Sequence, residues 1–128
     1  MSPKLATFRR DIQPRLADGR NFALEKASPL ITASPNSPLA SSLPTYQRVY
    51  KGVAKCFTYL HNRDRARYEA EYARTLEHAT PLLGTLESLA HDNSIEENAY
   101  LGVAGALKDD FKFLATVAEA LTASGLWK

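Results

Sequence analysis

The sequence has little of several features that would point to a particular chemistry or compartment. Its 128 residues include a single cysteine, Cys56, so no disulfide can form within the chain. No apolar run approaches the roughly 18 residues that a membrane-spanning helix needs. Because Cys56 adjoins Phe57 in an apolar setting, we expect its thiol to be a small buried hydrophobic group rather than a nucleophile. The sequence therefore predicts a soluble or peripheral protein with no transmembrane segment.

Patterns typical of catalysis and metal binding are also missing. The three histidines, His61, His78 and His91, are never three or four residues apart, so they form no helix-borne metal pair. The neighbouring Asp109 and Asp110 point to different sides of a helix, which does not suit paired acid and base carboxylates. The chain has no glycine-rich phosphate loop, no nucleophile elbow and no Cys/His cluster. We therefore expect no catalytic residues, no metal site and no enzyme.

Proline is rare in most of the chain and frequent at its beginning. Six of the seven prolines fall within residues 1–44, and the run SPLITASPNSPLASSLP cannot hold a helix. We predict that residues 1–44 form an extended N-terminal tail or a targeting segment, and that residues 45–128 form one helical domain. The arginines near the N-terminus are a little like those of a mitochondrial presequence, but Asp11 and Asp18 do not fit that pattern.

The first part of the helical domain has the spacing of a helical hairpin. Apolar residues recur three and four positions apart between Tyr46 and Leu60, and again between Tyr68 and Ala79. The turn sequence HNRDR separates the two runs, and Asn62 or Asp64 is expected to cap the second helix. Gly52 lies inside the first helix, where it would be tolerated more readily if another group approached closely.

The second part of the domain predicts one short helix and one long helix. Pro81 would end the second helix and, with Thr80 as its cap, start a short third one. Ser94 and Glu97 have the spacing of a capping box at the start of a long helix, which would end near Gly125. No segment alternates as a β-strand would. The predicted fold class is all-α, an antiparallel helical bundle of three to four helices with an extended Pro/Ser-rich N-terminal tail.

Charge is distributed unevenly, although the net charge is only +2. Residues 45–75 carry seven Lys and Arg against three Asp and Glu, whereas residues 76–128 carry three against eight. In the first helix, Arg48, Lys51 and Lys55 fall on one narrow strip, because seven residues make nearly two turns. Basic residues commonly border the apolar stripe of an amphipathic helix, so an ordinary solvated helix edge is one interpretation of this strip.

A second interpretation comes from a resemblance. The stretch VYKGVAK resembles the signature of the LYR-motif family of small mitochondrial helical proteins, which is Leu-Tyr-Arg followed one turn later by a basic residue. Val49, Tyr50 and Lys51 take the Leu, Tyr and Arg places. The stretch RDRARYEAEYAR is similar to the second helix of that family, with Tyr72 in the place of a Phe and Arg74 after it.

The resemblance implies a non-catalytic accessory subunit or assembly factor of a mitochondrial multiprotein complex, such as a respiratory-chain complex, that docks an acyl carrier protein. In that family, basic residues of the first helix meet the carrier's acidic helix and phosphopantetheine phosphate, and the acyl chain enters between the helices. The implied partner-binding residues are Arg48, Tyr50, Lys51, Lys55 and Arg74. The implied acyl-chain lining is Tyr46, Val53, Phe57 and Tyr72. No cofactor is bound directly, since the acyl-phosphopantetheine would arrive on the carrier protein.

The same basic residues also suggest an alternative function. Arg63, Arg65 and Arg67 in the turn, together with the Lys51 and Lys55 strip, suit RNA or DNA contacts by a small helical subunit of a ribonucleoprotein complex. The acidic last part of the chain and a pI near 8.7 argue against a large phosphate footprint. The LYR resemblance implies a location in the mitochondrial matrix, and without it a cytoplasmic location is expected.

Overall fold

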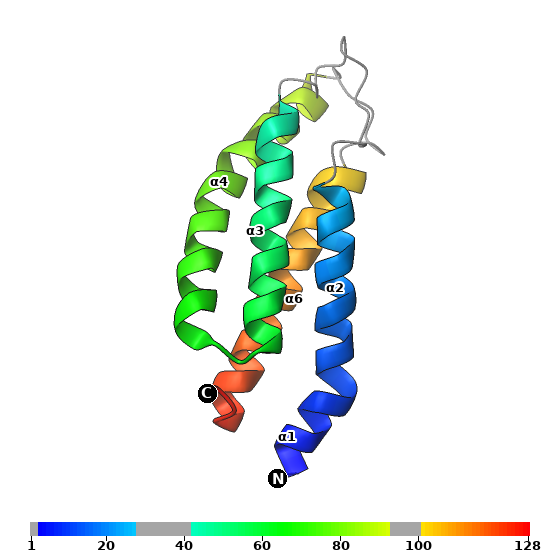
Figure 1. Cartoon of the computed structure of the whole chain (residues 1–128). Coiled ribbons are helices and arrows are strands. Elements are labelled where there is room, and N and C mark those ends of the chain that lie inside the picture. The colour runs from blue at the N-terminus through cyan, green and yellow to red at the C-terminus, as the bar shows by residue number, and fades with distance from the viewer. Residues whose placement is uncertain (1–2, 28–41, 93–100) are drawn as a thin grey trace.

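The computed structural model describes residues 3–27, 42–92 and 101–128. Within these ranges every element of regular structure is helical, which confirms the predicted all-α bundle. The four long helices are α2 (Gln13–Lys26), α3 (Leu43–His61), α4 (Arg65–His91) and α6 (Ala106–Ser124). They run alternately up and down, and α3 lies between α2 and α4 with α6 behind (Figure 1). None of the described helices combines the length and apolarity that crossing a membrane would require.

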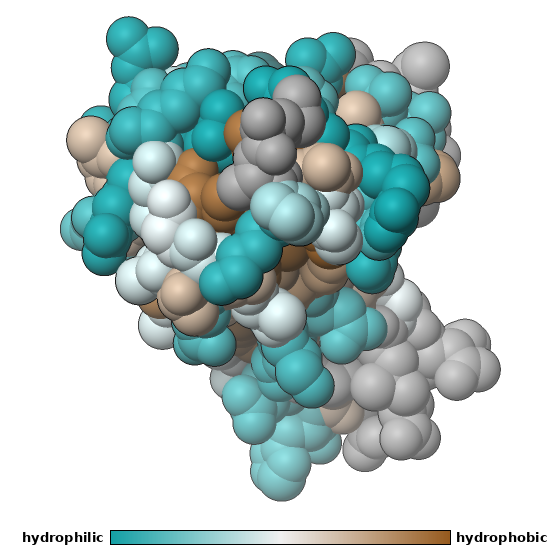
Figure 2. Space-filling model, turned by 90° about the horizontal axis from the view of Figure 1, so that it is seen from below, coloured by the Kyte–Doolittle hydropathy of each residue, from teal (hydrophilic) through white to brown (hydrophobic). Residues whose placement is uncertain are grey.

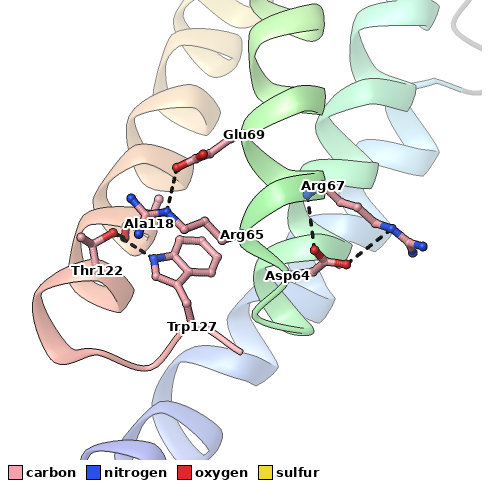
Figure 3. Close-up of polar contacts among 7 residues, drawn as sticks. All are labelled: Asp64, Arg65, Arg67, Glu69, Ala118, Thr122 and Trp127. Atoms are coloured by element: carbon pink, nitrogen blue, oxygen red, sulfur yellow. Dashed lines mark hydrogen bonds and ion pairs between the residues drawn. The ribbon is translucent and has the colours of Figure 1, made fainter.

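The predicted hairpin of the first two amphipathic segments is confirmed as α3 and α4. The apolar stripe of α3 is buried, including Val49, Val53 and Leu60. Asp64 caps α4, because its side chain accepts a hydrogen bond from the backbone N–H of Arg67 at 3.3 Å (Figure 3). The short connection between His61 and Arg65 joins the two helices as an antiparallel pair, as predicted (Figure 1).

The prediction of an extended tail is wrong for residues 3–27. This segment forms α1 (Pro3–Thr7), the π-helical turn η1 (Phe8–Ile12) and then α2, which packs along α3. Pro14 has no N–H to donate, and it is accommodated at the start of α2 after the wider turn, in which the Gln13 N–H bonds to the Phe8 carbonyl. The Pro/Ser-rich run lies mostly in residues 28–41, outside the described residues.

Few apolar residues were needed to bring this N-terminal segment into the core. Leu16 and Ala23 of α2 are buried, and so is Phe8 of η1. Gly19 lets the Phe57 ring approach so closely that a Cβ at Gly19 would lie 2.5 Å from Phe57 Cε1. An ion pair of 3.6 Å between Lys26 Nζ and Asp110 Oδ2 also joins α2 to α6. The first helix of the bundle thus comes from the part of the chain that was predicted to lie outside it.

The prediction of a separate short helix after Pro81 is also wrong. Helix α4 continues through Pro81 to His91, and the proline ring is exposed to solvent. Thr80 is no cap, since its hydroxyl donates to the Leu76 carbonyl at 2.8 Å within the helix. The neighbouring Ala79 and Leu82 are buried in the core, so tertiary packing holds the helix together across the missing N–H. The capping box at Ser94 and Glu97 lies outside the described residues.

One short segment precedes α6 and another follows it. The π-helical turn η3 (Leu101–Gly105) leads into α6, and Gly125 ends the helix in the left-handed conformation with φ 64°, as predicted. The following residues fold back onto the α3–α4 turn, where the Lys128 N–H bonds to the Arg63 carbonyl at 3.0 Å. Trp127 stacks on Tyr68. Its Nε1 donates a hydrogen bond to Thr122 Oγ1 at 2.9 Å (Figure 3).

Candidate basic recess between α3 and α4

Basic side chains from two helices line one recess on the face formed by α3 and α4. Its volume is about 230 Å³. Its lining residues are Arg48, Lys51, Gly52 and Lys55 from α3 and Glu71, Arg74, Thr75 and His78 from α4. We call this feature the basic recess. Four of the five partner-binding residues expected from the sequence therefore lie together, the exception being Tyr50.

The two helices come close together at the recess because of a glycine. Gly52 is buried, and a Cβ built there would collide with the side chain of Thr75 on α4. The close approach that was expected around Gly52 is thus made by Thr75. Next to this contact, the longer basic side chains of Arg48, Lys51 and Lys55 extend outward into solvent. A small residue in the middle and long cations around it give a concave, positively charged surface.

One carboxylate lies within the basic recess and is already paired. Glu71 is only 8% exposed, and its Oε2 accepts a hydrogen bond from Arg74 Nη1 at 3.1 Å. Among the described residues that line the recess, Glu71 is the one acidic side chain against four Lys and Arg. The lining therefore keeps a net positive charge, which favours an anion.

Tyr50 lies in the core rather than in the basic recess. Its side chain is fully buried, and its ring lies 4.8 Å from that of Tyr46 and 5.0 Å from Lys26 Nζ of α2. Burial raises the pKa of the Tyr50 phenol well above its ordinary value. The side chain is therefore neutral and cannot meet a partner at the surface of this structure.

The four residues of the expected acyl-chain lining are buried or half-buried, and none of them lines the basic recess. Val53 and Phe57 are buried, and the Phe57 ring lies 6.1 Å from Phe113 of α6. Tyr46 and Tyr72 are half-buried, and the Tyr72 ring meets Phe111 edge-on at 5.7 Å. The rings of Phe57 and Tyr72 therefore pack against α6, and the Phe57 ring also lies against Gly19 of α2.

Cys56 is buried, as the apolar residues around it in the sequence predicted. The side chain is fully buried, and burial, with a smaller contribution from the charge of Glu71, raises the pKa of the thiol to about 12. A thiol with such a pKa stays protonated near neutral pH and is a poor nucleophile. In the described part of the chain, no three His, Cys, Asp or Glu side chains gather as a metal site would require.

Three polar residues of the basic recess were not predicted from the sequence, namely Glu71, Thr75 and His78. His78 was interpreted as an ordinary histidine, and Thr75 was given no role. Arg74 and His78 are four residues apart on α4, so helical spacing places them on one face. That spacing identifies the face, but only the hairpin geometry shows that it borders the basic strip of α3.

The arginines of the α3–α4 turn, which suggested nucleic-acid binding, are engaged within the fold. Arg63 Nη1 donates to the Leu126 carbonyl at 3.0 Å. Arg65 pairs with Glu69 at 2.9 Å, and Arg67 Nε lies 3.5 Å from Asp64 Oδ2 (Figure 3). The Arg63 contact ties the turn to the C-terminal residues, whereas the side chains of Arg65 and Arg67 stay 51% and 73% exposed beside their ion pairs.

The fold and the site together define a small helical bundle with a cationic recess on one face. Comparison with protein-family models, with curated proteins and with solved structures gives no match for this chain. The resemblance of the α3 stretch to the LYR motif therefore rests on those residues alone.

Proposed function

We propose that this protein is a non-catalytic accessory subunit or assembly factor of a mitochondrial multiprotein complex, and that its basic recess docks an acyl carrier protein. The observation that carries the proposal is the gathering of Arg48, Lys51, Lys55 and Arg74 around one recess. These residues come from two helices and were expected from the sequence to contact the same partner.

The chemistry of the basic recess suits a phosphate group carried by an acidic protein. Phosphate oxygens accept charge-assisted hydrogen bonds from Arg and Lys, which are about twice as strong as bonds between neutral groups. The cations Arg48, Lys51 and Lys55 form a strip roughly 10 Å long along α3. Such a strip complements an acidic helix, and this complementarity speeds association and selects the partner.

The packed core limits what the partner can insert. Val53 and Phe57 are buried, the Phe57 ring lies against Gly19 of α2, and Leu16 of α2 is itself fully buried. An acyl chain among these residues would require α2 to leave α3. The proposal therefore assigns the binding energy to the phosphate and the acidic helix, and a carrier without an acyl chain should bind through the same residues.

The test is calorimetric titration of the full chain with three forms of an acyl carrier protein. The apo form has an unmodified serine, the holo form carries phosphopantetheine, and the third form carries decanoyl-phosphopantetheine. We expect the holo form to bind at least tenfold more tightly than the apo form, since a charge-assisted hydrogen bond contributes about 1.5–3 kcal/mol. Lys51→Glu combined with Lys55→Glu should abolish binding, with helicity unchanged by circular dichroism.

A matched control is available on α6. Lys108 and Lys112 are exposed, four residues apart as Lys51 and Lys55 are, and outside the basic recess. Lys108→Glu with Lys112→Glu makes the same change in net charge and should leave binding intact. Equal loss in both double variants, or no carrier binding by the unaltered protein, would contradict the proposal. Salt-sensitive RNA retention that disappears in the Lys51→Glu, Lys55→Glu variant would instead favour the ribonucleoprotein function.

A further inference from the structure

A second concavity lies at the end of the bundle where both termini are found, and it differs in chemistry from the basic recess. It is an open groove of about 430 Å³ between the N-terminal segment and α6. Seen from this end, apolar surface lies between hydrophilic side chains (Figure 2). Small-molecule sites typically have volumes of roughly 300–1,000 Å³ and mostly apolar walls, so this groove has the size and character of a ligand site.

Two helical faces form the walls of this terminal groove. Phe8 and Ile12 line it from η1, and Phe113, Val117 and Leu121 line it from α6. The residues of each wall are four apart, which places them on one side of their helix. The groove therefore has an apolar wall on each side, and a hydrocarbon chain can lie between them.

Basic residues stand at both ends of the η1 wall. Lys4 and Arg15 line the groove, and no acidic side chain does so in the part of the chain that the structure describes. The guanidinium of Arg15 lies over the Phe113 ring, 4.7 Å from its centroid, so the aromatic wall itself orients this cation. A guanidinium can hold a carboxylate through two parallel hydrogen bonds, which a lysine cannot do.

We propose that the terminal groove binds a free long-chain carboxylate, with the carboxylate on Arg15 and the hydrocarbon chain between the walls of η1 and α6. Apolar walls account for the chain, and cations without a neighbouring acid in the lining account for the charge of its head group. With the carboxylate on Arg15, the hydrocarbon chain lies along Ile12 and Phe8 of the η1 wall. The inference does not depend on carrier binding, because the groove and the basic recess share no residue.

The experiment is calorimetric titration of the full chain with octanoate, decanoate and dodecanoate below their micelle concentrations, and with decyltrimethylammonium as a cation of equal chain length. We expect one molecule to bind per chain. Each two methylene groups that enter the groove should tighten binding about tenfold, because burial contributes about 0.8 kcal/mol per methylene. Decyltrimethylammonium should bind at least tenfold more weakly than decanoate.

Variants then test the two parts of the site separately. Arg15→Gln should weaken decanoate binding tenfold or more, whereas Arg20→Gln, an exposed arginine of α2 outside the groove, should not change it. Ala120 is exposed and lines the groove, so Ala120→Trp should fill it and prevent binding. Ala70→Trp, at an exposed position of α4, is its control. Melting by circular dichroism should stay close to that of the unaltered protein in all four variants.

Several results would overturn the inference. One is equal affinity for decanoate and decyltrimethylammonium, and another is decanoate binding that Ala120→Trp leaves unchanged. Binding to phosphatidylglycerol vesicles without binding of free decanoate would assign the groove to a membrane surface. A dimer in sedimentation velocity that Ala120→Trp converts to a monomer would assign it to a second copy of this chain.

Discussion

Single residues set the distance between α3 and α4 at the basic recess. A Cβ at Gly52 would collide with Thr75 Oγ1 and would lie 3.1 Å from Thr75 Cβ, so the two helices meet at a position where only hydrogen fits. Glycine inside a helix costs about 1 kcal/mol relative to alanine. Here that cost is offset by a close contact, which also places Arg74 beside the cations of α3.

We predict that Gly52→Ala destabilises the protein although alanine is the better helix former. Overpacking a close contact costs about 1–3 kcal/mol, which exceeds the gain in helix propensity. Gly84 of α4 is the matched control, because nothing lies within 4 Å of a Cβ there, and Gly84→Ala should stabilise by up to about 1 kcal/mol. Urea unfolding measures both changes. A stabilising Gly52→Ala would show that α3 and α4 are further apart than this contact requires.

Among the elements, α4 shows how packing overrides a local sequence signal. Its sequence contains a helix breaker at Pro81, yet the helix runs from Arg65 to His91. The buried residues Ala79, Leu82 and Leu86 hold its second half to the core, while the proline ring lies on the solvent side. The apolar spacing on both sides of the proline was visible in the sequence. That the two halves belong to one continuous helix could be seen only from the shared core.

Pro81 is therefore expected to lower the stability of a helix that other contacts maintain. Pro81→Ala restores a backbone N–H to the helix interior, and we expect it to raise the free energy of unfolding by about 1–3 kcal/mol. Pro44, in the first turn of α3, provides the control. A proline there loses no intrahelical hydrogen bond, so Pro44→Ala should change stability by no more than about 0.5 kcal/mol. If urea unfolding of Pro81→Ala matches that of the unaltered protein, backbone hydrogen bonding around Pro81 is already satisfied in another way.

For the whole molecule, the α3–α4 hairpin and the end of α6 were predicted well, whereas the N-terminal segment and the continuation of α4 through Pro81 were not. The hairpin, the Asp64 cap and the Gly125 stop follow from local rules of spacing and chemistry, and so does the strip of Arg48, Lys51 and Lys55. The N-terminal segment does have helical spacing, because Leu5, Phe8, Ile12 and Leu16 recur three and four residues apart, but its prolines and arginines are also typical of tails. The spacing could therefore have indicated a helix, whereas the contact of Gly19 with the Phe57 ring is visible only in the folded structure.

The role of α2 in the bundle can be tested on two leucines of this one helix. Leu16 is fully buried, whereas Leu24 is 48% exposed, and both lie in α2. If α2 is part of the core, Leu16→Ala removes buried methyl groups and leaves a cavity, and the free energy of unfolding should fall by about 2–5 kcal/mol.

Leu24→Ala, the same change at the exposed position, should alter stability by no more than about 0.5 kcal/mol. Urea unfolding of the full chain, followed by circular dichroism, compares the two variants directly. If the first residues formed a tail outside the domain, as their composition suggested, both substitutions would be neutral. A loss confined to Leu16→Ala requires α2 to be packed in the native state, where it covers the core residues of α3 and so limits what a partner can insert between the helices.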